Sequence, residues 1–98
     1  MIRGLLVKPL EYPQVVMAEN DMIAVSAMIQ GYPYAIHLTP QLVLICPAMD
    51  GTSTLTPNRC LDDGTLIQGI FLIAGMQDGQ LQSLTDEWLD QLYPRFYY

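Results

Sequence analysis

The side chains that could carry out covalent chemistry are one histidine and two cysteines. His37 and Cys46 each lie in an apolar segment, and Cys60 lies in a polar one. A cysteine and a histidine can form a nucleophile–base pair if the fold brings them together and a third group orients the histidine. Cys46 is expected to be a small buried hydrophobe, and no pattern marks a third member. A cryptic Cys/His hydrolase is therefore the least favoured interpretation.

Ligands for a metal or a cofactor are missing from the sequence pattern. The single histidine has no partner at metal-ligand spacing, and the two cysteines do not form a C-x-x-C pair. The sequence also contains no Gly-rich phosphate loop, no G-x-S-x-G elbow and no paired-carboxylate motif. We expect no metal, no cofactor and no catalytic residue, and hence a binding protein rather than an enzyme.

Arg59 is the one basic residue in the middle of the chain. It follows Asn58 at the end of a polar loop predicted over residues 50–59. A guanidinium in this setting could clamp a phosphate or carboxylate with two hydrogen bonds, with Asn58 as a second ligand-binding residue. The structural alternative is an ion pair with Asp62 or Asp63, which would fix the turn predicted at 62–64. Both interpretations stay open.

Tyrosines gather at two places. Tyr32 and Tyr34 flank a proline just after a predicted helix, and four aromatic residues crowd the C-terminus, namely Tyr93, Phe96, Tyr97 and Tyr98. Tyrosine is enriched at interfaces, so Tyr32 and Tyr34 are candidate ligand-stacking or oligomer contacts. Packing under the sheet explains them equally well.

Asp86, Glu87 and Asp90 form an acidic cluster on the first turns of a predicted C-terminal helix. Carboxylates near a helix N-terminus are stabilised by the helix dipole, and a solvated face needs no further explanation. The alternative is a protein-interaction surface for a basic partner.

The overall charge excludes some classes of partner. Ten acidic and four basic residues give a net charge of −6, and the basic residues are too scattered to form a stripe. Direct nucleic-acid binding is therefore not expected. No apolar run is long enough to span a bilayer and the N-terminus does not look like a signal peptide, so we expect a cytoplasmic protein without membrane contact. Only 14% of residues are charged, against about 25% in an average domain, which favours a homo-oligomer or a covered binding face.

The chain is expected to form one α+β domain over residues 1–98, with the order β-β-α-β-β-β-α and a mostly antiparallel sheet with two helices packed on it. The predicted strands cover 2–7, 14–18, 34–38, 42–46 and 66–74, and the predicted helices start at 22 and 86. The last strand is almost continuously apolar, which predicts burial on both faces, and its Gly69 marks a bulge or a close backbone approach.

Capping residues set the predicted helix ends. Asn20-Asp21 and Thr85 are N-cap signals, and Leu84 with Leu89 fits a hydrophobic staple. Gly31 is expected as the C′ residue of the first helix, and Pro94 is expected to end the second.

Six short segments have the order and spacing of a family of small bacterial proteins known as a domain of unknown function. They are 7–9 (VKP), 31–32 (GY), 42–46 (LVLIC), 57–59 (PNR), 68–75 (QGIFLIAG) and 83–87 (SLTDE). The chain resembles this family over nearly its whole length, with Ile70 in place of a polar residue and an unusually aromatic tail as departures. The resemblance implies an origin in phages, plasmids or conjugative elements, often among antirestriction genes, but no established activity.

Three functions are compatible with these observations. The resemblance favours a mobile-element accessory that antagonises a host defence, either by blocking a protein effector or by sequestering a small signalling nucleotide. The second is a homo-oligomeric structural or interaction module without a defence role. The third is the hydrolase described above.

Overall fold

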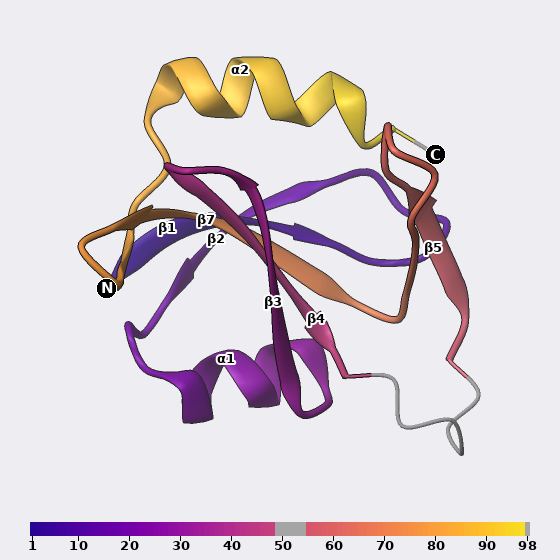
Figure 1. The fold of residues 1–98 in the computed structure, drawn as a ribbon, viewed down its shortest axis with the longest axis horizontal. Helices are drawn as coiled ribbons and strands as arrows, with labels where there is room; N and C mark the ends of the chain where they lie inside the picture. Colours follow the sequence, from indigo (N-terminus) through magenta and orange to yellow (C-terminus); the bar gives the residue numbers. More distant parts are fainter. Residues whose placement is uncertain (49–54, 98) are drawn as a thin grey trace.

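A six-stranded antiparallel sheet lies between two helices, one on each face (Figure 1). The computed structural model describes residues 1–48 and 55–97. The elements in chain order are β1 Ile2–Val7, β2 Gln14–Ala18, α1 Met22–Ile29, β3 Pro33–Thr39, β4 Leu42–Pro47, β5 Pro57–Cys60, β6 Leu66–Gln68, β7 Phe71–Gln77, β8 Gln80–Gln82 and α2 Asp86–Arg95.

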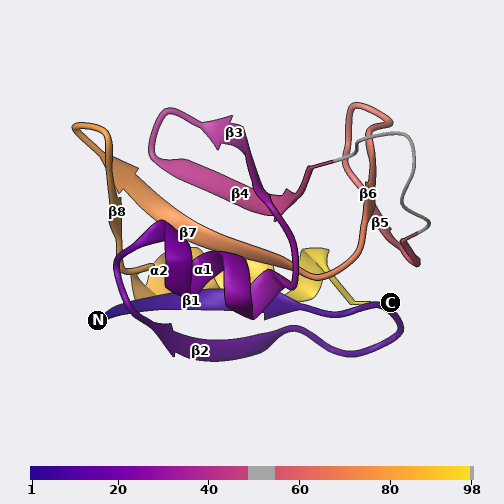
Figure 2. The same cartoon turned by 90° about the horizontal axis from the view of Figure 1, so that it is seen from below.

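The strand order of the sheet is β2-β1-β7-β4-β3, and β8 pairs with the end of β7 (Figure 2). This confirms the α+β class and the predicted order of the main elements. Two short strands are added: β8 in the sheet, and β5, which forms a separate two-stranded hairpin with β6. The strand predicted over 66–74 is divided into β6 and β7 at Gly69–Ile70. The edges of the sheet are β2 on one side and β3 on the other.

β7 is the central strand, and it is buried on both faces as predicted. Phe71 and Ile73 belong to the core under α2, whereas Leu72 and Ala74 belong to the core under α1. All four are fully buried. Successive side chains of a strand point to opposite faces, so one continuous apolar run supplies both cores.

The predicted N-caps are confirmed. The Ala24 N–H donates to the Asp21 carboxylate at 2.9 Å, and the Trp88 N–H donates to the Thr85 hydroxyl at 3.2 Å. Each bond satisfies a backbone donor that has no partner within its helix. Leu84, just before Thr85, is buried beneath α2.

The predicted role of Gly31 is wrong. The left-handed residue at the end of α1 is Gln30, with φ of 59°, and the N–H groups of both Gln30 and Gly31 donate to the Ser26 C=O. Gly31 has a different reason to be glycine, because a Cβ there would lie 2.8 Å from Pro47 Cβ. Close approach of two segments, rather than backbone conformation, excludes a side chain.

Pro94 does not end α2, because the helix continues to Arg95. Proline lacks the N–H that would donate to a C=O group one turn back. The last turn tolerates this loss because it adopts the tighter 3₁₀ hydrogen-bond pattern. There the Phe96 N–H donates to the Tyr93 C=O, three residues back, at 3.3 Å. Neither of the described helices is long and apolar enough to cross a membrane.

Candidate functional site

β2 presents apolar side chains to solvent at the edge of the sheet. Val15 and Met17 are 48% and 54% exposed, although they lie opposite Leu5 and Arg3 of β1. Leu5 belongs to the core under α2, so the side chains of Val15 and Met17 point to that same side of the sheet. The core under α2 draws buried residues from β1, β4, β6 and β7 but none from the outer strand β2, which α2 leaves uncovered (Figure 2).

One flank of α2 lies beside these residues. The Arg3 guanidinium donates to the Leu84 C=O at 2.9 Å and forms a 2.9 Å ion pair with Asp86. Asp86, Asp90 and Tyr93 are spaced by four and three residues, so they share the flank that Arg3 marks. Asp90 and Glu87 are exposed and form no ion pair with any described residue.

A chain of aromatic rings connects α2 to the β1–β2 connection. The ring of Tyr97 lies edge-on to those of Tyr93 and Tyr12, with centroids 5.4 Å apart in both pairs. Tyr12 and Tyr97 are both exposed. Edge-to-face geometry holds the rings in fixed positions, which lowers the entropy lost when a partner covers them.

Together these residues form one surface, which we call the β2–α2 face. It consists of Tyr12, Val15, Met17, Asp86, Asp90, Tyr93 and Tyr97. It combines aromatic and aliphatic side chains with carboxylates, and one strand edge lies beside it. Such a surface can bind a protein segment that supplies apolar side chains and a basic group.

Arg59 lies in a different place and is almost buried, with 8% of its surface exposed. Its guanidinium donates to the Phe96 C=O at 2.9 Å, to the Glu11 C=O at 2.6 Å and to the Asn58 Oδ1 at 2.7 Å. The Asn58 amide in turn donates to the C=O groups of Val7 and Gly69, at 3.0 and 2.7 Å. The pair therefore joins β5 to the ends of β1 and α2.

These contacts favour a structural role for Arg59, although not through the expected ion pair. Asp62 pairs with Arg95 at 2.6 Å, and the Asp63 carboxylate accepts the Thr65 N–H at 2.9 Å. That bond lowers the pKa of Asp63 and fixes the predicted turn. The predicted polar loop is wrong at its end, since Pro57–Cys60 forms β5. Its part over 50–54 lies outside the described residues.

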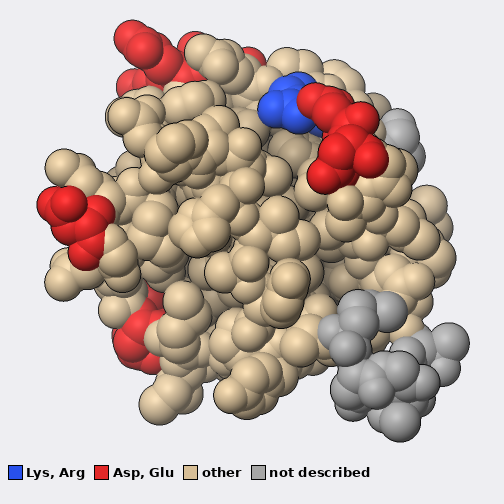
Figure 3. Space-filling view, viewed as in Figure 1, with Lys and Arg blue, Asp and Glu red and all other residues tan. Residues whose placement is uncertain are grey.

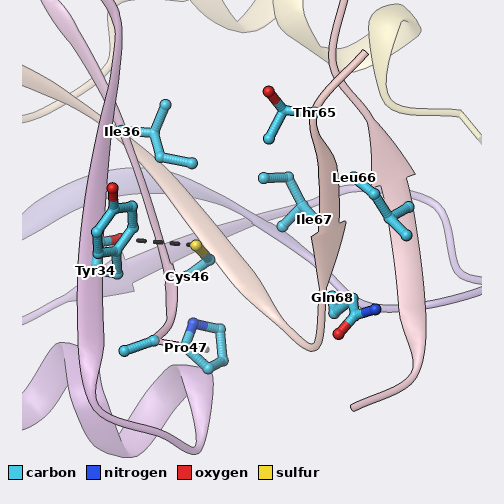
Figure 4. A pocket seen from close by; sticks show the side chains of 9 residues that line it. Tyr34, Ile36, Cys46, Pro47, Thr65, Leu66, Ile67 and Gln68 are labelled. Atoms are coloured by element: carbon cyan, nitrogen blue, oxygen red, sulfur yellow. Dashed lines mark hydrogen bonds between the residues drawn. The ribbon is translucent and has the colours of Figure 1, made fainter. Parts of the chain in front are cut away.

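Tyr34 lines a cleft of about 350 Å³ between the β3–β4 hairpin and β6 (Figure 4). Ile36, Cys46 and Ile67 point into this cleft, and none of the described residues that line it is charged. Tyr32 lies instead in a depression beside α1. The four proposed ligand-binding residues are therefore not brought together, because Tyr34 and Tyr32 occupy separate hollows and the Arg59 guanidinium is engaged elsewhere.

Cys46 and His37 do not form a pair. His37 lies opposite Val43, whose side chain is in the core under α1, whereas Cys46 is in the core under α2. Their side chains thus point to opposite faces of the sheet. Burial raises the pKa of the Cys46 thiol, which donates to the Tyr34 C=O at 3.7 Å, so it stays protonated. Across residues 1–48 and 55–97, no group of three His, Cys, Asp or Glu residues is placed to hold a metal ion.

Sequence reasoning missed the apolar half of the β2–α2 face. The sequence predicts the strand over 14–18, but it does not predict that this strand lies at the edge of the sheet and exposes Val15 and Met17. The sequence contains part of this information, because the first hairpin is rich in apolar residues. Such a hairpin must either be covered by other elements or have a strand at the edge of the sheet. The contact of Tyr12 with Tyr97 joins residues 85 positions apart and has no local signal.

The fold defines a small α+β domain, with one helix on each face of its sheet and the β2–α2 face exposed at one edge. The chain belongs to the DUF3846 family, described as a domain of unknown function, whose model matches residues 2–97. No curated protein and no solved structure matches the chain. Membership of a domain-of-unknown-function family is thus established.

Proposed function

We propose that this chain is a non-enzymatic binding protein of a phage or mobile element that antagonises a host defence by blocking a protein effector. The observation that carries the proposal is the β2–α2 face, where exposed tyrosine, valine and methionine side chains lie beside carboxylates. An acidic, aromatic surface fits a partner whose binding region is basic and apolar. The proposed place of action is the cytoplasm.

Sequestration of a signalling nucleotide has less support from the positions of the cations. Three of the four basic side chains are engaged within the chain, because Arg3 pairs with Asp86, Arg95 with Asp62, and Arg59 binds backbone carbonyls. A phosphate would have to displace one of these partners or rely on Lys8 alone. A net charge of −6 also opposes the approach of an anion.

The test is a plating assay with phage on bacteria that carry a defence system against which the wild-type protein restores plaques. The variant Asp90→Lys reverses a charge in the middle of the face without breaking an ion pair. Asp86→Lys with Asp90→Lys is the stronger form, although it also removes the contact with Arg3. Both should lose the restoration of plaques, because a basic partner would be repelled.

The matched control is Asp78→Lys, which reverses one exposed charge in the β7–β8 turn, away from the face. It should restore plaques like the wild type. Circular dichroism must show that all variants are folded. Full activity of the folded Asp86→Lys, Asp90→Lys protein would refute the proposed face. A small nucleotide retained in native mass spectrometry, with activity unaffected at Asp90, would favour sequestration.

A further inference from the structure

β3 is the other edge of the sheet, and it differs from β2 in its charge surroundings. No described strand pairs with its outer side. Its sequence, Pro33–Thr39, contains no Lys, Arg, Asp or Glu. Figure 3 shows the side of the molecule on which β3 lies in Figure 1: uncharged side chains cover the middle, and the Asp and Glu side chains lie towards the margins.

Edge strands in monomeric proteins are usually protected by charged side chains, because their free N–H and C=O groups can pair with another strand. β3 has no such charge. Its protection is confined to its two ends, where Pro33 lacks an N–H and a register shift lies between His37 and Thr39. A short window between these ends is left open to pairing.

The backbone groups in that window can be identified. The Ala48 N–H donates to the Tyr32 C=O at 2.7 Å, in line with the register that pairs Tyr34 with Cys46. Backbone groups alternate along a strand, so even-numbered residues point towards β4 and odd-numbered residues point outwards. Pro33 fits this assignment, since a proline belongs where no donor is needed. Ala35 and His37 therefore carry the free N–H and C=O groups.

We propose that this edge is where a second copy of the chain binds, by antiparallel pairing of β3 with β3 about a twofold axis at Ile36. In this register, Ala35 of one copy and His37 of the other exchange both of their backbone hydrogen bonds, and symmetry repeats the exchange. A shift by two residues in one direction would place Pro33 opposite His37 and lose a donor. A shift in the other direction would run into the irregularity at 37–39.

Charge explains why the occupant is a second copy rather than the basic partner of the β2–α2 face. Two chains that each carry a net charge of −6 repel each other, so their contact must avoid opposing carboxylates. Pairing through β2 would place the flanks of α2, with Asp86 and Asp90, against each other. Pairing through β3 brings neutral surfaces together, with Tyr34 opposite Leu38 of the other copy, and covers the rim of the apolar cleft.

The first measurement is the mass of the full chain by sedimentation between about 1 µM and about 1 mM, the range in which small interfaces associate. The wild type should shift from 11.0 kDa to twice that mass. Ala35→Glu places a carboxylate on each edge without removing a contact to β4, because Ala35 is exposed. It should raise the concentration of half-dimerisation by about 100-fold or more.

Val15→Glu is the matched control, since it adds the same charge to the exposed side of the other edge strand. It should leave the dimer intact. Amide exchange gives a second readout, in which the N–H groups of Ala35 and His37 become protected only at dimer-forming concentrations. A wild-type monomer throughout the range, a dimer lost with Val15→Glu but kept with Ala35→Glu, or free exchange at Ala35 and His37 in the dimer would each overturn the proposal.

Discussion

Replacing Arg59 with alanine should destabilise the fold, because its guanidinium joins three separate parts of the chain. It donates to the backbone of Phe96 after α2, to that of Glu11 in the β1–β2 connection, and to the Asn58 side chain in β5. The alanine variant loses these three bonds and a longer one to the Asn58 C=O at 3.4 Å, and it leaves the Phe96 C=O without its donor in a buried position. The same change in a ligand-binding arginine would leave the stability unaltered.

The magnitude follows from the number and setting of these bonds. A hydrogen bond from a charged donor contributes about 1.5–3 kcal/mol, so three would amount to about 4.5–9 kcal/mol if they were additive. Water can replace the bond at the exposed Glu11, and bonds made by one side chain are coupled rather than additive. We therefore expect a loss of about 3 kcal/mol, which lowers the melting temperature by about 12–24 °C in a domain of this size.

The assay is urea and thermal unfolding, followed by circular dichroism and by the fluorescence of the single tryptophan. Arg59→Lys keeps the charge, but all the donors of lysine are on a single nitrogen atom. About half of the loss in the free energy of unfolding should therefore remain. The matched control is Arg95→Ala, which breaks an ion pair whose side chains are 48% and 89% exposed and should cost at most about 0.5 kcal/mol. If Arg59→Ala lowers the free energy of unfolding by no more than this control does, the structural role is refuted and a ligand-binding role is favoured.

Three further predictions rest on single contacts. Gly31→Ala should cost about 1–3 kcal/mol in urea unfolding, because its Cβ would lie 2.8 Å from Pro47 Cβ; an unchanged midpoint would show that the two segments separate easily. In thiol labelling, Cys46 should react at least about tenfold more slowly than the exposed Cys60, since burial raises the pKa of Cys46 and blocks access; equal rates would contradict this. Asp63→Asn should be less stable than the wild type at neutral pH, and the difference should vanish as the pH falls through the lowered pKa of Asp63; a difference that persists in strong acid would exclude the carboxylate as its cause.

The fold could be predicted where local signals are sufficient. Apolar runs of strand length, the N-caps Asp21 and Thr85 and the turn at 62–64 each act over a few residues, and each is found in the structure. The predicted double burial of β7 is also correct, because an uninterrupted apolar run needs two cores. In these segments, the structure that the local sequence favours is the one that the whole fold requires.

The role of Arg59 could not be predicted, because its partners are backbone carbonyls. Every residue has a carbonyl group, so no residue type marks Glu11 or Phe96 as an acceptor 48 or 37 positions away. The nearby Asp62 and Asp63 were the obvious partners by charge and separation. The strand β5 was missed because its residues, Pro57–Cys60, look like a loop, and because the side-chain bonds that Asn58 and Arg59 make are non-local.

We propose different partners for the two edges of the sheet because charge is distributed differently around them. Carboxylates beside β2 oppose pairing with an identical chain and favour a basic one, whereas the neutral surroundings of β3 allow an identical chain to approach. The two contacts lie at opposite edges of one sheet, so both can form at once, and a dimer would present two β2–α2 faces pointing away from each other. Ala35→Glu should therefore weaken dimerisation by the factor given above yet keep binding at the β2–α2 face. Only the extra affinity that comes from linking two binding sites in a dimer should be lost. Val15→Glu should do the reverse, and a variant that lost both properties while remaining folded would show that the two edges are not independent.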